Sequence, residues 1–278
     1  MKLSVVIPAH NEEHCVAETV RAVAAVLLSE GIPHEILAIN DNSIDGTEAV
    51  LQTLRLEIPN FVYFNNEGMN GFGYAVREGL RRYSGDCVAI MMADLSDSPR
   101  DLVRYYRKLS EGFDCVFGNR WVNGAEVRDY PVAKRIVNRL ANTAIRVAFR
   151  LKYSDCTNAF KLYSRGVIEG CRPFLSPHFN LTIELPLKAI VRGYSYAVIP
   201  TDWSNRKTGE SKLKMKEMGT RYFFILLYCL IEKYFSAGDF HRSVKEKHKH
   251  DREVRAAATA VQPHSAAAAN RGFDGDSK

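Results

Sequence analysis

Short apolar segments alternate with longer amphipathic segments through the first half of the chain. The apolar segments have the length of strands, and they occur at 3–7, 35–40, 61–65, 87–92 and 114–117. The segments between them repeat with helical spacing, and in the first one Val16, Val20 and Val23 fall on one face. Strands that alternate with helices predict βαβ units. We therefore expect an α/β fold with a mostly parallel sheet flanked by helices.

The pattern changes in the second half of the chain. Residues 132–150 have the periodicity of an amphipathic helix, and a further strand is expected at 159–163. Residues 222–231 form an apolar run that is well short of the ~20 residues that a transmembrane helix needs. The last part, 237–278, is polar and then alanine-rich, which is typical of a disordered tail.

These patterns predict three parts of the chain. We assign residues 1–217 to the α/β domain, 218–236 to an amphipathic helix at a membrane interface, and 237–278 to the disordered polar tail. A length of 278 residues, 46% of them apolar, is enough for a hydrophobic core without disulfides or metals as staples.

Cysteine usage and the first residues favour a reducing compartment. The six cysteines show neither CxxC spacing nor a paired framework, so we expect no zinc site and no disulfide scaffold. Met1 and Lys2 lead directly into the first expected strand, without the pattern of a secretory signal. We therefore expect a cytoplasmic protein.

Positive charge is concentrated in one short stretch. The net charge is only +6, but five cations lie close together between residues 206 and 216: Arg206, Lys207, Lys212, Lys214 and Lys216. Such a cluster predicts an anionic partner, although a charge run can also be a solvated loop.

Polar residues follow three of the expected strands. They occur at 8–13, 41–47 and 93–97. Each group read alone could simply cap the next helix. In open α/β folds, however, ligands bind outside the carboxyl ends of the strands, and capping does not explain why all three groups lie at one edge of the sheet. The three groups together favour a ligand site.

Several motifs in order resemble a known family. The first four are SVVIPAHNEE, DNSIDGT, NGFGYAVREGL and MADLSDSP, and three more follow: GNRWVNG, DCTNAFKLY and RKTGESKL. Over residues 3–215 the chain is similar to the family 2 glycosyltransferases of the GT-A fold, especially the dolichol-phosphate mannosyltransferase-like branch. The resemblance implies a Rossmann-like GT-A domain, here with a C-terminal amphipathic helix.

The resemblance implies a donor site at the first two strand ends. Pro8, His10, Glu12 and Asp41 match the positions that hold the nucleoside, where carboxylates suit ribose hydroxyls and base N–H groups. Ala93 is assigned to the same donor site. His10 stands where an aromatic residue is usual, so it stacks on the base or is simply a surface histidine.

The resemblance also implies a divalent metal ion, Mg²⁺ or Mn²⁺. Met92 replaces the first aspartate of the usual Asp-x-Asp motif, which leaves Asp94 as the matching carboxylate. Ser96 and Asp97 are the other expected ligands, because hard cations take oxygen donors and are often completed by phosphates and water. Asp97 could instead cap the following helix.

Cationic side chains are expected to handle the phosphates. Arg120, Arg206 and Lys212 match the family's phosphate-handling positions, as does Lys134 or Arg135. We assign catalytic roles to Asp94, Arg120 and Arg206. A lipid phosphate is already anionic, so it can attack the sugar without a general base, and the site mainly has to offset charge repulsion.

The predicted reaction is transfer of a sugar with inversion onto a polyprenyl or dolichyl phosphate. The donor is expected to be GDP-mannose or UDP-glucose. The apolar run beside the basic loop predicts binding to a membrane surface, peripherally on the cytosolic face, with or without a membrane-protein partner. A buried helix or a dimer contact would give the same run. We expect no nucleic acid among the partners.

Three other readings remain open at this stage. One is a family 2 enzyme that acts on a polysaccharide or another non-lipid acceptor. Another is a weakened enzyme that binds its donor without turnover, because Met92 interrupts the metal motif. The third, a dinucleotide-binding fold, is suggested by Gly71 and Gly73, but Val76 occupies the third glycine position of that motif.

Overall fold

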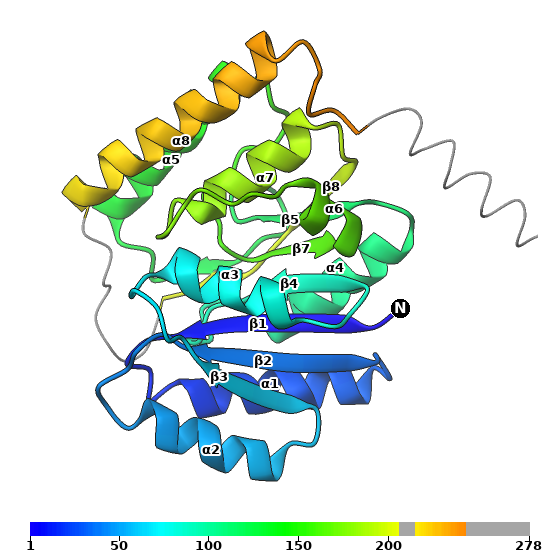
Figure 1. Ribbon diagram of the computed structural model, residues 1–278, viewed down its shortest axis with the longest axis vertical. Coiled ribbons are helices and arrows are strands. Elements are labelled where there is room, and N and C mark those ends of the chain that lie inside the picture. Colours follow the sequence, from blue (N-terminus) through cyan, green and yellow to red (C-terminus); the bar gives the residue numbers. More distant parts are fainter. Residues whose placement is uncertain (206–214, 243–278) are drawn as a thin grey trace, which may run out of the picture. The chain divides into compact units, whose positions relative to one another are not determined.

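The computed structural model describes residues 1–205 and 215–242, and its core is one central sheet (Figure 1). The sheet has seven strands in the order β3-β2-β1-β4-β7-β5-β8. Their bounds are β1 Leu3–Ala9, β2 His34–Asn40, β3 Phe61–Asn65, β4 Cys87–Ile90, β5 Cys115–Asn119, β7 Lys161–Ser164 and β8 Tyr196–Pro200. A second sheet pairs two short strands, β6 Val127–Arg128 and β9 Trp203–Ser204.

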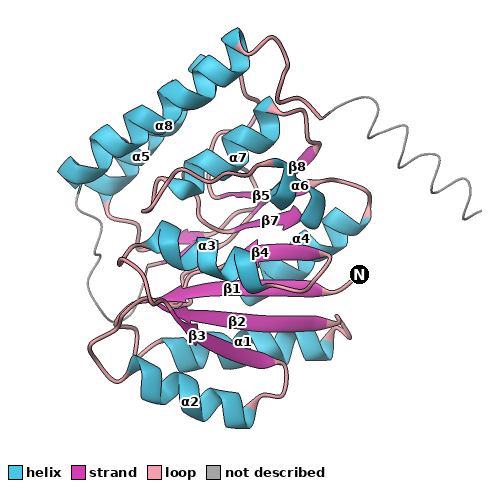
Figure 2. Cartoon of the chain, in the orientation of Figure 1, coloured by secondary structure: helices cyan, strands magenta, loops and turns pink. Residues whose placement is uncertain are grey.

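Helices connect most of the strands (Figure 2). They are α1 Val16–Ser29, α2 Thr47–Glu57, α3 Phe72–Arg82, α4 Pro99–Ser110, α5 Val132–Phe149, α6 Arg165–Gly170, α7 Leu181–Val191 and α8 Met215–Phe235. Local sequence explains several of their ends: Pro99 begins α4, where its missing N–H costs nothing.

Six of the seven strands in the large sheet run in the same direction. β1 is parallel to both β2 and β4, as βαβ units require. β7 is the exception, because it lies between β4 and β5 and is antiparallel to both. Its first residue, Lys161, pairs with Ile90 at the end of β4. The start of β7 therefore lies at the same edge as the carboxyl ends of the parallel strands.

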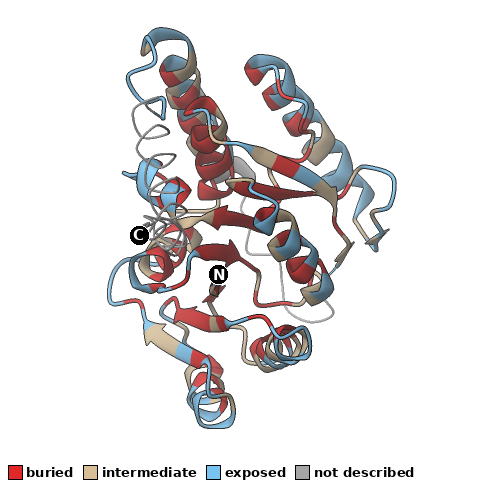
Figure 3. Cartoon of the chain, turned by 90° about the vertical axis from the view of Figure 1, so that its right-hand side faces the viewer, coloured by how far each residue is buried: buried red, intermediate tan, exposed pale blue. Residues whose placement is uncertain are grey.

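The core lies on both faces of the sheet, and Figure 3 shows the buried strands between helices. Side chains alternate along β1: Val6 packs with Val76 of α3 on one face, and Val5 packs with Val20 of α1 on the other. A central strand that is covered on both faces needs a nearly continuous apolar sequence, which β1 has.

The expected α/β fold is confirmed. The five strands expected in the first half and the one near 161 are present, and so is the helix expected at 132–150. The sequence patterns did not reveal α6, α7, β6, β8 or β9. The apolar run belongs to α8, and no helix among the described residues is long and apolar enough to cross a membrane. Most of the expected tail, 243–278, lies outside the described residues.

Candidate active site

The ends of β1 and β2 are joined by hydrogen bonds between their loops. The Nδ1 of His10 donates to the main-chain oxygen of Asp41 over 2.6 Å. Two residues further on, the main-chain N–H of Glu12 donates to the Thr47 hydroxyl over 2.8 Å. The structure therefore brings together three of the residues assigned to the donor nucleoside, and it fixes the ring of His10 through its backbone contact.

The Asp41 carboxylate is buried and already has two donors. Its Oδ1 accepts from Asn66 Nδ2 over 2.7 Å, and its Oδ2 accepts from the N–H of Gly71 over 2.8 Å. Asp41 thus holds the loop between β3 and α3 as well as facing the sheet edge. Asn66 is a residue that the sequence analysis missed, because a lone asparagine after a strand carries no distinctive pattern.

Pro8 and Ala93 are buried and present no polar side chain at the strand ends. Pro8 is buried within β1, opposite Ile39 of β2. Ala93 is buried after β4, and its carbonyl accepts a hydrogen bond of 2.7 Å from the Thr19 hydroxyl.

A tight turn follows β4 and carries Asp94. Leu95 has a φ of 53°, a left-handed conformation that is uncommon for a branched residue. The turn lets the main-chain N–H of Ser96 donate to Asp94 Oδ1 over 3.1 Å. The carbonyl of Ser96 accepts from the N–H of Ser204 over 3.0 Å, which ties the turn to β9.

Asp97 is almost completely buried, with 2% of its surface exposed. Its Oδ2 has no hydrogen-bond partner among the described residues. Burial, followed by the charge of Asp94, raises the pKa of Asp97 to about 7, although Arg120 opposes the rise. The N-cap of α4 is Ser98, and no side chain caps this helix. Capping therefore does not explain Asp97.

The residues of this turn offer oxygen ligands of the kind that a divalent metal ion takes. No three His, Cys, Asp or Glu side chains cluster around a metal-sized space anywhere in 1–205 or 215–242. The carboxylates of Asp94 and Asp97 and the Ser96 hydroxyl are nevertheless hard oxygen donors. The partnerless Oδ2 of Asp97, buried beside a second carboxylate, is the kind of atom that a cation satisfies.

Arg120 is paired with a buried acid. Its Nε and Nη2 donate to the two carboxylate oxygens of Asp155, each over 2.8 Å. Burial alone would lower the pKa of Arg120, but Asp155 raises it above the usual value. From its motif, Arg120 was predicted to contact the substrate phosphates directly. In the structure, the Nε and Nη2 groups of the Arg120 guanidinium are instead bound to Asp155. The position of Asp155 in the motif DCTNAFKLY gave no sign of this pairing.

An aromatic cluster lies beside Arg120. Trp121 packs edge-on against Tyr130, and Tyr130 in turn contacts Trp203, with ring centroids 5.4 and 4.8 Å apart. Trp121 lies within GNRWVNG, but the motif alone did not point to this cluster.

Two arginines of α5 stack on the same tryptophan. The guanidinium carbons of Arg135 and Arg139 lie 5.2 and 5.6 Å from the centre of the Trp121 ring. One nitrogen of Arg139, Nη1, is buried without a hydrogen-bond partner among the described residues. Arg135 was one of two expected phosphate-handling residues, whereas Arg139 was missed, although it lies one turn further along the same face of the helix.

Lys134, the alternative to Arg135 at the expected phosphate-handling position, is an exposed residue of α5. Arg206 and Lys212 lie outside the described residues, as does most of the basic cluster.

Comparison with known proteins identifies the family. Residues 4–171 match the family model described as glycosyl transferase family 2. The chain therefore belongs to glycosyl transferase family 2.

Two curated proteins are similar to most of the chain. The chain is 30% identical over 220 residues to a dolichol-phosphate mannosyltransferase of Pyrococcus furiosus, covering 78% of this chain and 60% of that protein. It is 31% identical over 218 residues to a polyprenol monophosphomannose synthase of Mycolicibacterium smegmatis, covering 75% of this chain and 80% of the relative. The chain thus spans about three fifths of the length of the Pyrococcus protein.

Solved structures share the fold. A glucosyl-3-phosphoglycerate synthase from Mycobacterium tuberculosis, in complex with Mn²⁺, uridine diphosphate and glucosyl-3-phosphoglycerate, has a TM-score of 0.62 and 19% identity. The match covers 84% of this chain and 79% of that one. This similarity supports the GT-A architecture, while the low identity leaves the substrates to be argued from the site.

Proposed function

We propose that this protein is a metal-dependent glycosyltransferase that moves a hexose from a nucleotide donor onto a polyprenyl or dolichyl phosphate. The two curated relatives are named for dolichol-phosphate and polyprenol-phosphate mannose chemistry. The observation that carries the proposal is the pair of arginines on Trp121, because their helix also exposes an apolar stripe. A phosphate and a hydrocarbon chain can bind there side by side.

The nucleoside of the donor would bind at the ends of β1 and β2. Asp41 is held by two N–H donors, yet each carboxylate oxygen can accept further bonds from ribose hydroxyls or base N–H groups. His10, fixed by its bond to the Asp41 carbonyl, would border the base. GDP-mannose is the first donor to test because both relatives are named for mannose chemistry, and UDP-glucose is the second.

A divalent ion, Mg²⁺ or Mn²⁺, would be held by Asp94 and Asp97, with the Ser96 hydroxyl nearby. When bound, the ion would supply positive charge that offsets the departing diphosphate. Asp97 would replace the metal ligand that is lost at Met92, because one oxygen of its buried carboxylate has no hydrogen-bond partner among the described residues. The tight turn at Leu95 orients Asp94 toward the same edge of the sheet.

The acceptor phosphate would bind near Trp121. Arg139 has a buried nitrogen without a partner among the described residues, and Arg135 stacks on the same ring. Stacking leaves the N–H edges of a guanidinium available for phosphate oxygens. Arg120 would act mainly by positioning Trp121 and Tyr130, since its centre lies 5.6 and 5.8 Å from their rings.

The lipid would approach along α5 and α8. The two helices meet at their C-terminal ends (Figure 1), where the Tyr234 hydroxyl donates to the Ala148 carbonyl over 3.1 Å. Large exposed apolar side chains recur at every fourth residue of each helix: Val132, Ile136 and Leu140 on α5, and Phe223, Leu227 and Ile231 on α8. We call these residues the α5–α8 apolar stripes.

Stripes of this kind suit a membrane interface. Such exposure is costly in water, and it is expected where helices lie in a headgroup layer. We therefore infer peripheral binding to the cytosolic face of a membrane. A membrane-protein partner that covers the same stripes is the alternative form of this attachment.

The second candidate is transfer to a soluble acceptor. It is favoured by the likeness to an enzyme whose structure holds glucosyl-3-phosphoglycerate. An acceptor of that kind would use the arginines near Trp121 but would have no need of the apolar stripes. The two candidates therefore differ in their dependence on α5 and α8.

A transfer assay tests the proposal. Radiolabelled GDP-mannose and UDP-glucose are each supplied with a short polyprenyl phosphate, with Mg²⁺ or with chelator. We expect a lipid-extractable product that requires the metal. Product with 3-phosphoglycerate or an oligosaccharide, and none with the lipid, would select the soluble-acceptor candidate.

A further inference from the structure

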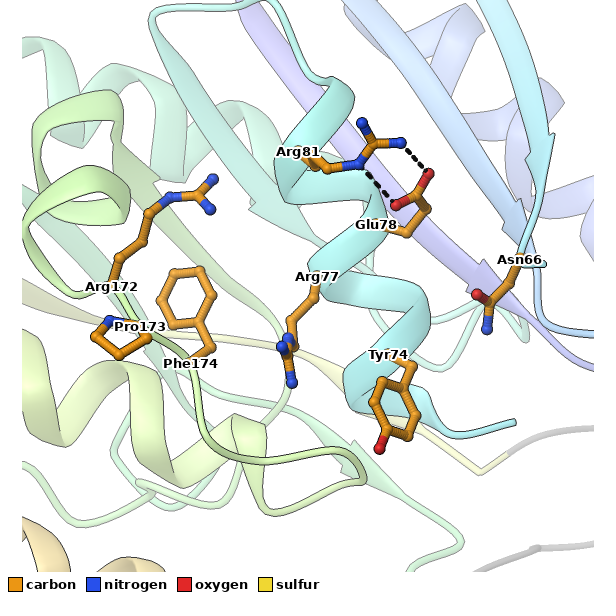
Figure 4. Close-up of a pocket in the computed structure, with 8 residues that line it drawn as sticks. All are labelled: Asn66, Tyr74, Arg77, Glu78, Arg81, Arg172, Pro173 and Phe174. Carbon is orange, nitrogen blue, oxygen red and sulfur yellow. Dashed lines mark hydrogen bonds and ion pairs between the residues drawn. The ribbon is translucent and has the colours of Figure 1, made fainter. Parts of the chain in front are cut away.

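A cavity of about 390 Å³ lies between α3 and the segment 172–174, in a place that the proposed reaction does not use (Figure 4). Its volume is within the range of small-molecule sites. The charged residues that line it are Arg77, Arg81, Arg172 and Glu78, a net charge of +2. An excess of arginine around a cavity of this size indicates an anionic ligand.

The one carboxylate of the cavity is already neutralised. Glu78 accepts from Nε and Nη2 of Arg81 over 3.0 and 2.8 Å, and Arg82 donates to it as well. The hydrogen bond from Arg81 is the main reason that the pKa of Glu78 falls to about 2. Glu78 therefore adds little repulsion, and Arg77 and Arg172 carry the unbalanced charge.

Arg77 extends from α3, and Arg172 extends from the segment on the other side of the cavity (Figure 4). Arg77 makes no ion pair among the described residues, and its guanidinium carbon lies 5.7 Å from the centre of the Tyr74 ring. Arg172 lies 5.7 Å from the Phe174 ring and donates through Nη2 to the carbonyl of Leu80 over 3.0 Å. Both guanidinium groups keep further N–H donors for an oxyanion.

Hydrogen bonds from α7 hold the wall of the cavity that lies opposite α3. The carboxylate of Glu184 accepts from the main-chain N–H groups of Leu175 and Ser176, each over 2.7 Å, and Lys188 donates to the Pro173 carbonyl over 2.6 Å. A Cβ on Gly73 would come within 2.4 Å of the Ser176 carbonyl oxygen. This close approach accounts for that glycine without a dinucleotide motif.

We propose that this cavity binds a phosphate group of a small phosphorylated molecule, held between Arg77 and Arg172. Both arginines are braced on an aromatic ring, so little side-chain freedom is lost on binding. Asn66 lines the cavity and also donates to Asp41. The cavity therefore adjoins the proposed nucleoside site at the ends of β1 and β2. The site is nevertheless separate from the metal turn and from the Trp121 cluster.

The probe for the test is inorganic pyrophosphate, titrated calorimetrically into the full-length protein in chelator. We expect saturable binding that Arg77→Gln weakens at least tenfold, whereas Arg55→Gln, which removes an exposed arginine of α2, leaves it unchanged. Arg172→Gln should also weaken binding, and unfolding curves show whether its lost bond to Leu80 harms the fold. If it does, Arg77→Gln alone decides the outcome.

A second arm separates the sources of the phosphate. Phosphatidylcholine vesicles with and without phosphatidic acid are compared by flotation, with the same variants. Pyrophosphate binding that depends on Arg77 supports a soluble ligand, and binding to phosphatidic acid alone with that dependence supports a lipid headgroup. Equal affinities of the wild type and Arg77→Gln in both arms would overturn the proposal.

Discussion

Asp155 holds Arg120 at two points, with Nε to Oδ2 and Nη2 to Oδ1 distances of 2.8 Å, and both side chains are more than nine-tenths buried. The main-chain N–H of Arg120 donates to the same carboxylate over 3.0 Å. One acid thus fixes both the backbone and the side chain at the end of β5. The pair orders the aromatic cluster that we assign to the acceptor.

Breaking this ion pair should strongly destabilise the protein. Asp155→Asn leaves a buried guanidinium without its counter-charge, and we expect the free energy of unfolding to fall by about 3–5 kcal/mol. Urea denaturation followed by circular dichroism measures the change. Glu126→Gln, which removes the exposed partner of Arg128, is the control and should change stability by less than about 1 kcal/mol. Equal losses in both variants would contradict the interpretation.

Removing the Asp94 carboxylate should abolish transfer without unfolding the protein. We expect Asp94→Asn to lower kcat by at least about a hundredfold, since charge stabilisation at the departing diphosphate is lost. Chelator should have the same effect on the wild type and little on the variant. The exposed Asp239→Asn is the control. Wild-type turnover after complete metal removal would rule out the metal assignment.

Arg139 should act on the acceptor alone. We expect Arg139→Gln to raise the KM for polyprenyl phosphate about tenfold or more, because a charge-assisted contact is worth about 1.5–3 kcal/mol. The KM for the nucleotide sugar should stay unchanged. Arg146→Gln, at an exposed position further along α5, is the matched control. A raised donor KM instead would assign Arg139 to the diphosphate.

The apolar stripe of α8 should hold the protein on membranes. Phe223→Ser/Leu227→Ser removes two exposed apolar side chains, each worth up to about 1.5–3 kcal/mol when fully buried. We expect at least a tenfold loss of vesicle binding in a flotation assay, with the unfolding curve unchanged. Leu28→Ser/Leu56→Ser, at exposed positions of α1 and α2, is the control. If the variant instead keeps vesicle binding but no longer forms dimers in solution, the stripe is a self-association surface.

Glu35 should make stability depend on acid. Burial alone would raise its pKa, but hydrogen bonds from Lys2, Ser4 and Ser84 lower it to about 2. The contribution of Glu35 to the free energy of unfolding is therefore fully present above its pKa in the unfolded chain, about 4.3, and is lost as the pH falls toward 2. We expect Glu35→Gln to lower stability by ~1–3 kcal/mol at pH 7 and progressively less below pH 4. Urea midpoints across pH 2–7, with Glu111→Gln as control, measure this.

Local pattern predicted the parallel half of the fold because each of its strands is a short apolar run beside an amphipathic helix. It did not predict α7, in which even Glu184 and Lys188 are buried, so the helix lacks a polar face to set its period. The pairing of those two charges compensates for their burial, and such pairing depends on tertiary structure. β6 and β9 were missed because two-residue strands carry no periodicity.

The same limit applies to the site. His10 and Asp41, which we assign to the donor, lie directly after β1 and β2, so the topology alone brings them together. Trp121 and Arg139 come from different elements and meet only in three dimensions. The role of Asp155 was hidden for the same reason, because its partner Arg120 lies 35 positions earlier in the chain.

The antiparallel placement of β7 has a consequence for biosynthesis. β4 and β5 are not neighbours in the sheet, so the hydrogen bonds of the first half cannot join those of β5 until β7 has been made. While the chain emerges from the ribosome, the hydrogen bonds between the ends of β1 and β2 can form early. The aromatic cluster around Trp121 must wait for Asp155 and then for Trp203. A chain halted before residue 160 would therefore leave β4 as an open sheet edge, to which chaperones can bind.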